Sequence, residues 1–197
     1  MKTMHIDDVL DRAHVVSLPL AVRFRGITTR EALLIEGPAG WGEFAPFLEY
    51  GPAESAAWLR AGLEAAYEGF PEPVRDSIEV NATIPAVPAS EVPAVVERYP
   101  GCRTFKIKVA EKGHTLADDA ARVRAVRDAV TQRGDIPILR VDANGGWTVD
   151  EAVEAAQMMM PLDYMEQPCA TTEELAQVRG RLMRAGLFVR VAADESI

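Results

Sequence analysis

Two lysines and three acidic residues are the side chains of this chain best suited to chemistry. Lys106 and Lys108 alternate with apolar residues, and Asp142, Glu166 and Asp194 each end a short apolar run. If these runs are parallel strands of one sheet, their carboxyl ends lie at one edge and the five side chains converge. A lysine can remove a proton beside a carboxylate, and carboxylate oxygens are ligands that Mg²⁺ prefers. The pattern therefore predicts a metal-assisted proton-abstraction site.

Each part of this pattern also has a simpler interpretation. Two solvated lysines on an exposed edge strand would explain Lys106 and Lys108, and a carboxylate at a strand end often caps the next helix. Helix caps are already supplied by Thr148 and Thr171, each of which stands three residues before a glutamate. Three strand-ending acids downstream of a lysine pair therefore favour a functional site over capping.

Strand alternation predicts which way the lysines face. Lys106 and Lys108 share one face, while Phe105, Ile107 and Val109 share the other, which should contact the surrounding helices. Both lysines should then point into the interior of a barrel. Partial burial beside a second ammonium would favour the neutral amine that Lys108 needs to act as a base.

The second half of the chain alternates between strand and helix patterns. Three of the helices begin at a capping threonine, Thr115, Thr148 or Thr171. Such repeats are typical of parallel βαβ units, and a full (β/α)₈ barrel needs eight strands. The fold class predicted is α/β, an incomplete (β/α)₈ barrel of about five strands. The predicted strands are 78–84, 104–109, 136–142, 162–166 and 187–194.

The first part of the chain predicts a small α+β unit. Strand patterns cover 14–24, 31–36 and 41–44, with a polar loop over 25–30 and a helix over 53–69. The predicted domains are 1–77 for this unit and 78–197 for the partial barrel.

Composition excludes several classes of protein. The chain has 197 residues, 48% of them hydrophobic and 26% charged, as in ordinary globular proteins. A formal charge of -9 without a basic cluster argues against nucleic-acid binding. Two cysteines are too few for a disulfide framework, acids occupy the place of a signal-peptide core, and no apolar run is long enough for a membrane helix. We expect a cytoplasmic protein without nucleic-acid or membrane partners; its oligomeric state is left open.

Four short motifs resemble those of the enolase superfamily, in the branch of the muconate-lactonising enzymes. They are Lys106-Ile107-Lys108, Asp142-Ala143-Asn144, Glu166-Gln167-Pro168 and Asp194-Glu195-Ser196. The resemblance implies that Asp142, Glu166 and Asp194 bind Mg²⁺, with Mn²⁺ as a possible substitute. It implies that Lys108 transfers the proton with electrostatic support from Lys106, and that Asn144 and Gln167 are outer contacts. It also implies that residues 1–77 form the capping domain of the family.

The segments 141–147 and 166–171 resemble most closely the actinobacterial members that dehydrate a succinyl-bearing hydroxycyclohexadiene carboxylate. The resemblance thus implies a lyase that acts on a small carboxylate through a metal-stabilised enediolate. An N-succinylamino acid racemase, a dipeptide epimerase and a non-catalytic product remain open. The family has a further lysine on a later strand and last barrel strands that help to bind the substrate, and this sequence ends before them, so we expect the 197-residue chain alone to be inactive and poorly soluble.

Overall fold

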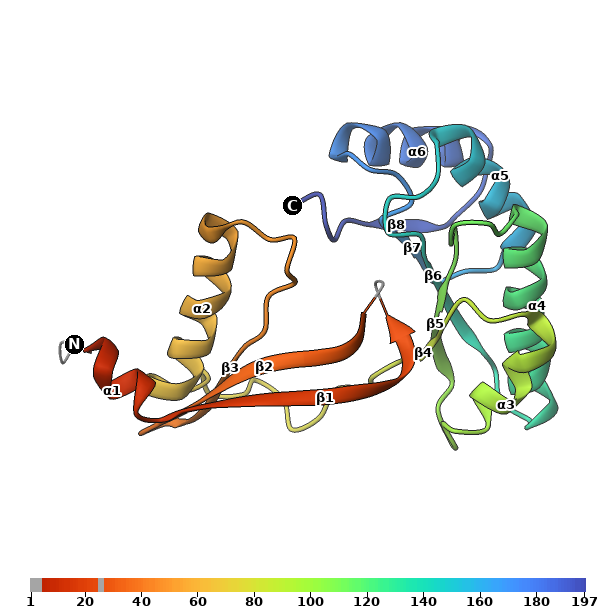
Figure 1. Cartoon of the computed structure of the whole chain (residues 1–197). Coiled ribbons are helices and arrows are strands. Elements are labelled where there is room, and N and C mark those ends of the chain that lie inside the picture. The colour runs from red at the N-terminus through yellow and green to blue at the C-terminus, as the bar shows by residue number, and fades with distance from the viewer. Residues whose placement is uncertain (1–4, 25–26) are drawn as a thin grey trace. The chain divides into compact units, whose positions relative to one another are not determined.

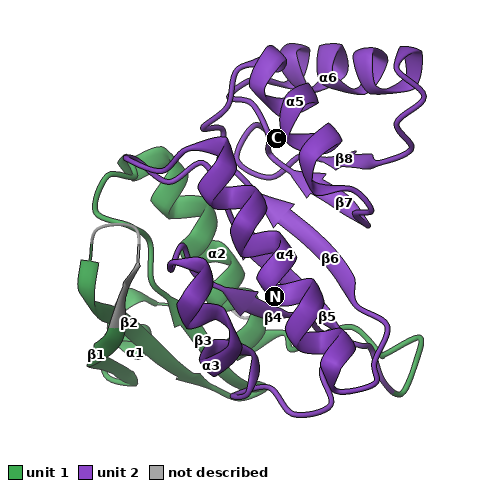
Figure 2. Cartoon of the chain, turned by 90° about the vertical axis from the view of Figure 1, so that its right-hand side faces the viewer, with its two compact units in different colours: residues 1–76 green, residues 77–197 purple. Residues whose placement is uncertain are grey.

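The computed structural model describes residues 5–24 and 27–197, and the chain divides into two compact units. The first ends at Asp76 and the second spans Ser77–Ile197 (Figure 2). The first contains a three-stranded sheet and the second a five-stranded sheet, and each has its own hydrophobic core.

An antiparallel sheet packed against one long helix forms the first unit (Figure 1). The strand order is β1-β2-β3, so β1 is an edge strand, where Pro19 is tolerated because an edge strand leaves some backbone groups unpaired. The elements of this unit are α1 (Ile6–Leu10), β1 (Ala13–Phe24), β2 (Ile27–Gly37), β3 (Gly40–Phe44) and α2 (Pro52–Tyr67).

Two glycines allow α2 to pack directly on β3. A Cβ added to Gly42 would lie 1.8 Å from the carbonyl oxygen of Gly62, and one added to Gly62 would lie 2.5 Å from the carbonyl oxygen of Glu43. Backbone therefore meets backbone at this crossing, and the core of the unit forms around Ile35 and Ala66 beside it.

The predicted loop over 25–30 is wrong from Ile27 onward. Ile27–Arg30 belong to β2, and Thr29 pairs with Pro19 of β1. The exposed threonines carry no apolar pattern, but antiparallel pairing of the backbone does not require one. Arg25 and Gly26 lie outside the described residues.

The second unit is a parallel sheet in the order β4-β5-β6-β7-β8, and Figure 1 shows its helices along the outer side of the curved sheet. The neighbouring strands pair in sequence order, as in a (β/α) barrel wall, and the expected α/β fold with five such strands is confirmed. The elements are β4 (Ala82–Ile84), the 3₁₀ helix η1 (Ala89–Glu91), α3 (Val92–Val96), β5 (Thr104–Lys108), α4 (Leu116–Gln132), β6 (Ile138–Asp142), α5 (Val149–Met159), β7 (Tyr164–Glu166), α6 (Thr172–Arg184) and β8 (Arg190–Ala192).

Several strands are shorter than their apolar runs predicted. Ile78 and Val80 are 73% and 78% exposed, and Phe188 is 88% exposed, so these residues precede the paired segments instead of joining them. Apolar character alone therefore overestimated strand length, because hydrogen-bonded pairing decides where a strand begins.

All three predicted helix caps are confirmed as capping boxes. Thr115, Thr148 and Thr171 each accept a hydrogen bond from the backbone three residues on, and the acid at that position bonds back to the threonine amide. The predicted alternation in β5 is also confirmed, since Phe105 and Ile107 are fully buried in the core while the two lysines lie on the opposite face.

Candidate active site

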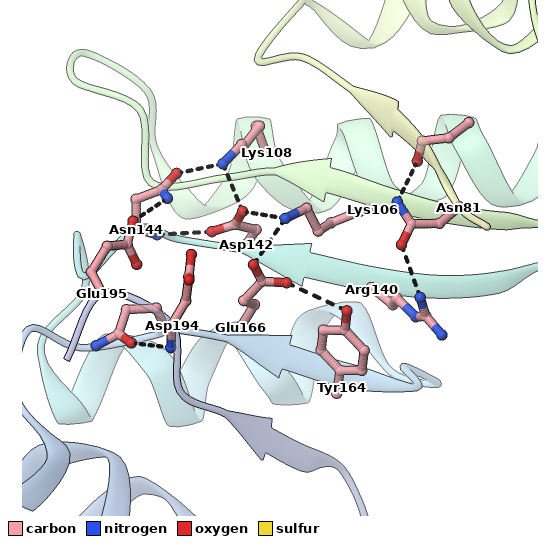
Figure 3. Close-up of polar contacts among 12 residues, drawn as sticks. Asn81, Lys106, Lys108, Arg140, Asp142, Asn144, Tyr164, Glu166, Asp194 and Glu195 are labelled. Atoms are coloured by element: carbon pink, nitrogen blue, oxygen red, sulfur yellow. Dashed lines mark hydrogen bonds and ion pairs between the residues drawn. The ribbon is translucent and has the colours of Figure 1, made fainter. Parts of the chain in front are cut away.

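Three neighbouring strands bring the first lysine-acid layer together. In the parallel ladder, Lys108 is level with Asp142, and Asp142 is level with Glu166. These residues end β5, β6 and β7, so their side chains meet at the carboxyl edge of the sheet (Figure 3). The convergence expected from the strand ends is therefore present for these three residues.

Both lysine ammoniums contact the carboxylate of Asp142. Lys108 Nζ lies 2.6 Å from Asp142 Oδ2, and Lys106 Nζ lies 3.0 Å from the same oxygen and 2.9 Å from Glu166 Oε1. Asp142 is 1% exposed, whereas the lysine side chains retain 17% and 22% exposure. The acid is thus buried beneath two cations that reach it from the more open side.

The lysines decide the protonation of this acid. Burial by itself raises the pKa of Asp142, but hydrogen bonds and charge from Lys108 and Lys106 outweigh it and hold the pKa below its ordinary value. For Lys106, burial lowers the pKa, while hydrogen bonds to Glu166 and Asp142 raise it more, so the pKa lies above its usual range. Asp142 is therefore a carboxylate and Lys106 a cation in this arrangement.

Asp194 is not positioned by strand pairing, unlike Asp142 and Glu166. Ala192, not Asp194, is level with Glu166, and Asp194 follows two residues after β8 ends. Its backbone amide donates to Gln167 Oε1 at 2.7 Å, and Figure 3 shows its carboxylate on the same side as those of Asp142 and Glu166. Among the described residues, no three His, Cys, Asp or Glu side chains are grouped closely enough to hold a metal ion. The lysines contact Asp142 and Glu166 instead, and the metal-binding role of the three acids stays a prediction.

Asn144 and Gln167, predicted as outer contacts, both touch the cluster. Asn144 Oδ1 accepts from Lys108 Nζ at 2.7 Å, its backbone amide donates to Asp142 Oδ1 at 3.1 Å, and its Nδ2 donates to Glu195 Oε1 at 2.6 Å. Gln167 is buried, and its Nε2 donates to the carbonyl of Cys169 at 2.9 Å. Both residues have positive φ, 45° and 38°, a strained conformation that often marks functional loops.

Sequence reasoning missed a second polar layer below the first. Arg140 donates to Asp163 Oδ2 at 2.9 Å and to Asn81 Oδ1 at 2.8 Å, and its guanidinium lies 4.8 Å from the ring centroid of Tyr164. Tyr164 Oη lies 3.4 Å from Glu166 Oε2 (Figure 3). Alternation along β6 and β7 carried a signal for this layer, because Arg140 and Tyr164 each stand two residues before an acid of the site.

The acids present fit a hard divalent cation. Asp142, Glu166 and Asp194 supply only carboxylate oxygens, the donor type that suits Mg²⁺, and each comes from a different strand or the loop that follows it. Two ammonium groups already lie 2.6 and 3.0 Å from Asp142 Oδ2, so a metal ion bound through that oxygen would have to displace them.

Cys169 is a packing residue rather than a nucleophile. It is fully buried in the core, and burial raises the pKa of its thiol to about 11, with smaller contributions from Glu174 and Glu151. A thiol with so high a pKa is a poor nucleophile at neutral pH.

Two family profiles match the chain. The family described as "Enolase N-terminal domain-like" matches residues 15–66, and "Enolase C-terminal domain-like" matches residues 89–197. The chain belongs to the enolase superfamily. The lysine pair and the acids described above all lie in the segment that matches the C-terminal domain of this superfamily.

Individual members of the superfamily are similar to this chain in sequence or in structure. The o-succinylbenzoate synthase of Mycolicibacterium smegmatis is 58% identical over 195 residues, which cover 98% of this chain and 57% of that protein. Among solved structures, the L-Ala-D/L-Glu epimerase of Bacillus subtilis matches with a TM-score of 0.71 and 25% identity, covering 94% of this chain and 67% of that one. The o-succinylbenzoate synthase of Thermosynechococcus elongatus, complexed with Mg in its active site, matches with a TM-score of 0.56 and 20% identity over 94% of this chain and 68% of that one, and this likeness shows the fold. The chain spans little more than half the length of its curated relative.

In the part of the chain that the structure describes, no helix has the length and apolar character needed to cross a membrane.

Proposed function

We propose that this chain carries the metal ligands and the proton-transferring lysine of an o-succinylbenzoate synthase. Such a lyase removes water from a succinyl-bearing hydroxycyclohexadiene carboxylate and forms o-succinylbenzoate for menaquinone biosynthesis. The observation that carries the proposal is the register of Lys108, Asp142 and Glu166 on three neighbouring strands. The identity of 58% to a relative of that name supports this substrate over others in the superfamily.

Lys108 is the base in this proposal. Its neutral amine takes the proton from the carbon beside the substrate carboxylate, and the electrons of the broken C–H bond first move toward that carboxylate and then form the new ring double bond as the hydroxyl leaves. The resulting ammonium returns the proton to the departing oxygen, so water is the product. One lysine serves both steps because a syn elimination removes hydrogen and hydroxyl from the same face of the ring.

The other residues of the cluster position and charge the site. Asn144 Oδ1 holds Lys108 Nζ at 2.7 Å and thereby directs the amine. Lys106, kept as a cation by Asp142 and Glu166, places a positive charge beside the substrate carboxylate. Asp142, Glu166 and Asp194 hold Mg²⁺, with Mn²⁺ as a substitute. When bound, the ion supplies positive charge that offsets the negative charge growing on the substrate carboxylate.

A racemase or epimerase is the second candidate. The similarity to the Bacillus subtilis epimerase, at a TM-score of 0.71, favours it. Such a reaction also starts with a proton taken beside a carbonyl carbon, so the same lysine and metal ligands would serve. The substrates separate the two candidates: a cyclohexadiene acid for the lyase, and N-succinyl amino acids or dipeptides for the others.

The test uses a protein of the length of the relatives. We would join this chain to the part of the Mycolicibacterium smegmatis synthase that the alignment does not cover, and assay it with each class of substrate at saturating Mg²⁺. Lys108→Ala should lower turnover of the diene acid by at least about 100-fold, the lower range for a lost acid-base group, and leave Mg²⁺ binding measurable by calorimetry.

Lys112→Ala is the matched control, because Lys112 is exposed and lies beyond the end of β5. It should retain full turnover. Undiminished turnover in Lys108→Ala would refute the assignment of the base, and turnover of only N-succinyl amino acids or dipeptides would favour the second candidate.

A further inference from the structure

A buried ion pair on α4 lies directly behind the strand that carries Lys108. Asp119 and Arg122 are each 1% exposed, and Arg122 Nη1 lies 2.6 Å from Asp119 Oδ1. Both residues fall on the helix face that otherwise packs Val126 and Val130 into the core. Since charged residues on an apolar helix face are costly to bury, this pair calls for a specific explanation.

The pair binds the backbone on both sides of Val109. Arg122 Nη1 donates to the carbonyl of Lys108 at 3.0 Å, and the amide of Ala110 donates to Asp119 Oδ2 at 2.8 Å. Val109 itself donates to the carbonyl of Asp142 at 3.0 Å. The last residue of β5 and the first two after it are therefore held from the helix and from β6 at once.

Two other nitrogen atoms of the Arg122 guanidinium also have hydrogen-bond partners. Nε donates to the carbonyl of Val87 at 2.6 Å, and Nη2 lies 2.8 Å from Nδ1 of His114, which must accept because a guanidinium only donates. Four of the five N–H groups of the guanidinium thus have partners, and only one of these partners is a charged group.

The strand end needs this support because its conformation is unfavourable. Ala110 has φ of 58°, in the left-handed region that a non-glycine residue adopts only when surrounding contacts hold it there. The Asp119 bond is made by this residue's own amide, immediately after the strand turns away.

We propose that Asp119 and Arg122 are positioning residues for Lys108. They fix the end of β5 so that the ammonium group of Lys108 contacts Asp142 and Asn144. The catalytic meaning of this arrangement rests on the proposed function, in which Lys108 transfers the proton. The positioning itself is a property of this chain and can be measured without turnover.

Asp119→Asn is the informative substitution. Asp119 uses one oxygen for Arg122 and the other for Ala110, so an amide must turn its NH₂ toward one of these donors and lose that bond. Side-chain size is retained. Arg122→Lys is the second variant, because a lysine cannot reach all of the partners of the guanidinium.

Arg133→Gln is the matched control. Arg133 follows the last residue of the same helix and also donates to backbone carbonyls, at 2.6 Å to Cys102 and 3.2 Å to Tyr99, which stand before the amino end of β5 and not at its carboxyl end. It should lower stability without disturbing Lys108.

The first readout is the ¹³Cε signal of Lys108 in the 197-residue chain labelled at lysine. The chain has only four lysines, Lys2, Lys106, Lys108 and Lys112, and Lys108→Arg identifies the signal. In Asp119→Asn the Lys108 signal should move toward that of exposed Lys112, while in Arg133→Gln it should stay in place.

The second readout is amide hydrogen exchange, which should accelerate at Ala110 by at least about tenfold relative to Val141 in β6. If Asp119→Asn does not fold, as judged by circular dichroism, Arg122→Lys is measured in its place with the same expectation. An unmoved Lys108 signal in a folded variant would overturn the proposal. Its failure is distinct from that of the proposed function, which is decided by turnover of Lys108→Ala alone.

Discussion

Gln167 connects two loops of the site, and its replacement by leucine tests how Asp194 is held in place. The buried side chain donates to the carbonyl of Cys169 at 2.9 Å and accepts from the amide of Asp194 at 2.7 Å. Ser196 adds a longer contact, from its hydroxyl at 3.2 Å. Leucine has a similar size, so the substitution removes polar contacts with little loss of packing.

The expected cost follows from what each partner can do afterwards. The Cys169 residue is fully buried, so its carbonyl would lose its donor where water cannot replace it, at a cost of about 1–3 kcal/mol. The Asp194 residue is exposed, so water can replace that bond and the loss is about 0.5–1 kcal/mol. Gln167→Leu should therefore lower the free energy of unfolding by about 1.5–4 kcal/mol, as the sum of these two effects.

Urea denaturation measures this loss, and calorimetric titration with Mg²⁺ measures the effect on the acids. Because Gln167 holds the segment that carries Asp194, Mg²⁺ affinity should fall by about 10–100-fold, as for other residues that orient metal ligands. Gln157→Leu, on the exposed side of α5, is the matched control and should change stability by less than about 0.5 kcal/mol. Equal stabilities for the two variants would refute the assigned role of Gln167, and unchanged Mg²⁺ affinity in a destabilised variant would separate Asp194 from the metal site.

Two further predictions concern the caps and the buried thiol. Thr148→Ala removes the bond from the Glu151 amide to the threonine hydroxyl and keeps the bond from the Thr148 amide to the Glu151 carboxylate. It should lower the free energy of unfolding by about 1 kcal/mol in urea denaturation, while Thr172→Ala, one residue past a cap, should have less than half that effect; equal effects would contradict the capping assignment. Because burial raises the pKa of Cys169 to about 11, only about one thiol in 1,000 is ionised at pH 8, so iodoacetamide should modify Cys102 first and react with Cys169 only as the pH approaches 11 or the chain unfolds; comparable rates at pH 8 by mass spectrometry would contradict this.

Much of the second unit could be predicted because its signals are local. Strand alternation depends only on the geometry of an extended chain, and it placed Phe105 and Ile107 in the core with the lysines opposite. Capping boxes depend on residues three apart, and all three threonines were identified. The ends of the strands were harder to predict from the sequence, because pairing with a neighbouring strand decides them. The exposed residues Ile78 and Phe188 were therefore wrongly assigned to strands.

The site was predicted in part for the same reason. Lys108, Asp142 and Glu166 end consecutive strands, and a parallel sheet brings such ends together whatever the loops do. Asp194 follows its strand by two residues, so its position depends on Gln167, a contact between segments that no local pattern encodes. The burial of Asp119 and Arg122 was also missed, although both share a helix face with Val126 and Val130.

The amino-acid sequence by itself determined where the helices begin, that the strands form a parallel α/β sheet and that Lys108, Asp142 and Glu166 end neighbouring strands, because these follow from periodicity and short-range hydrogen bonds. Only the tertiary structure decided that both lysines contact Asp142 and that an ion pair on α4 holds the strand beneath Lys108. These contacts join residues far apart in the chain, and their distances are set by the packing of a helix on a sheet.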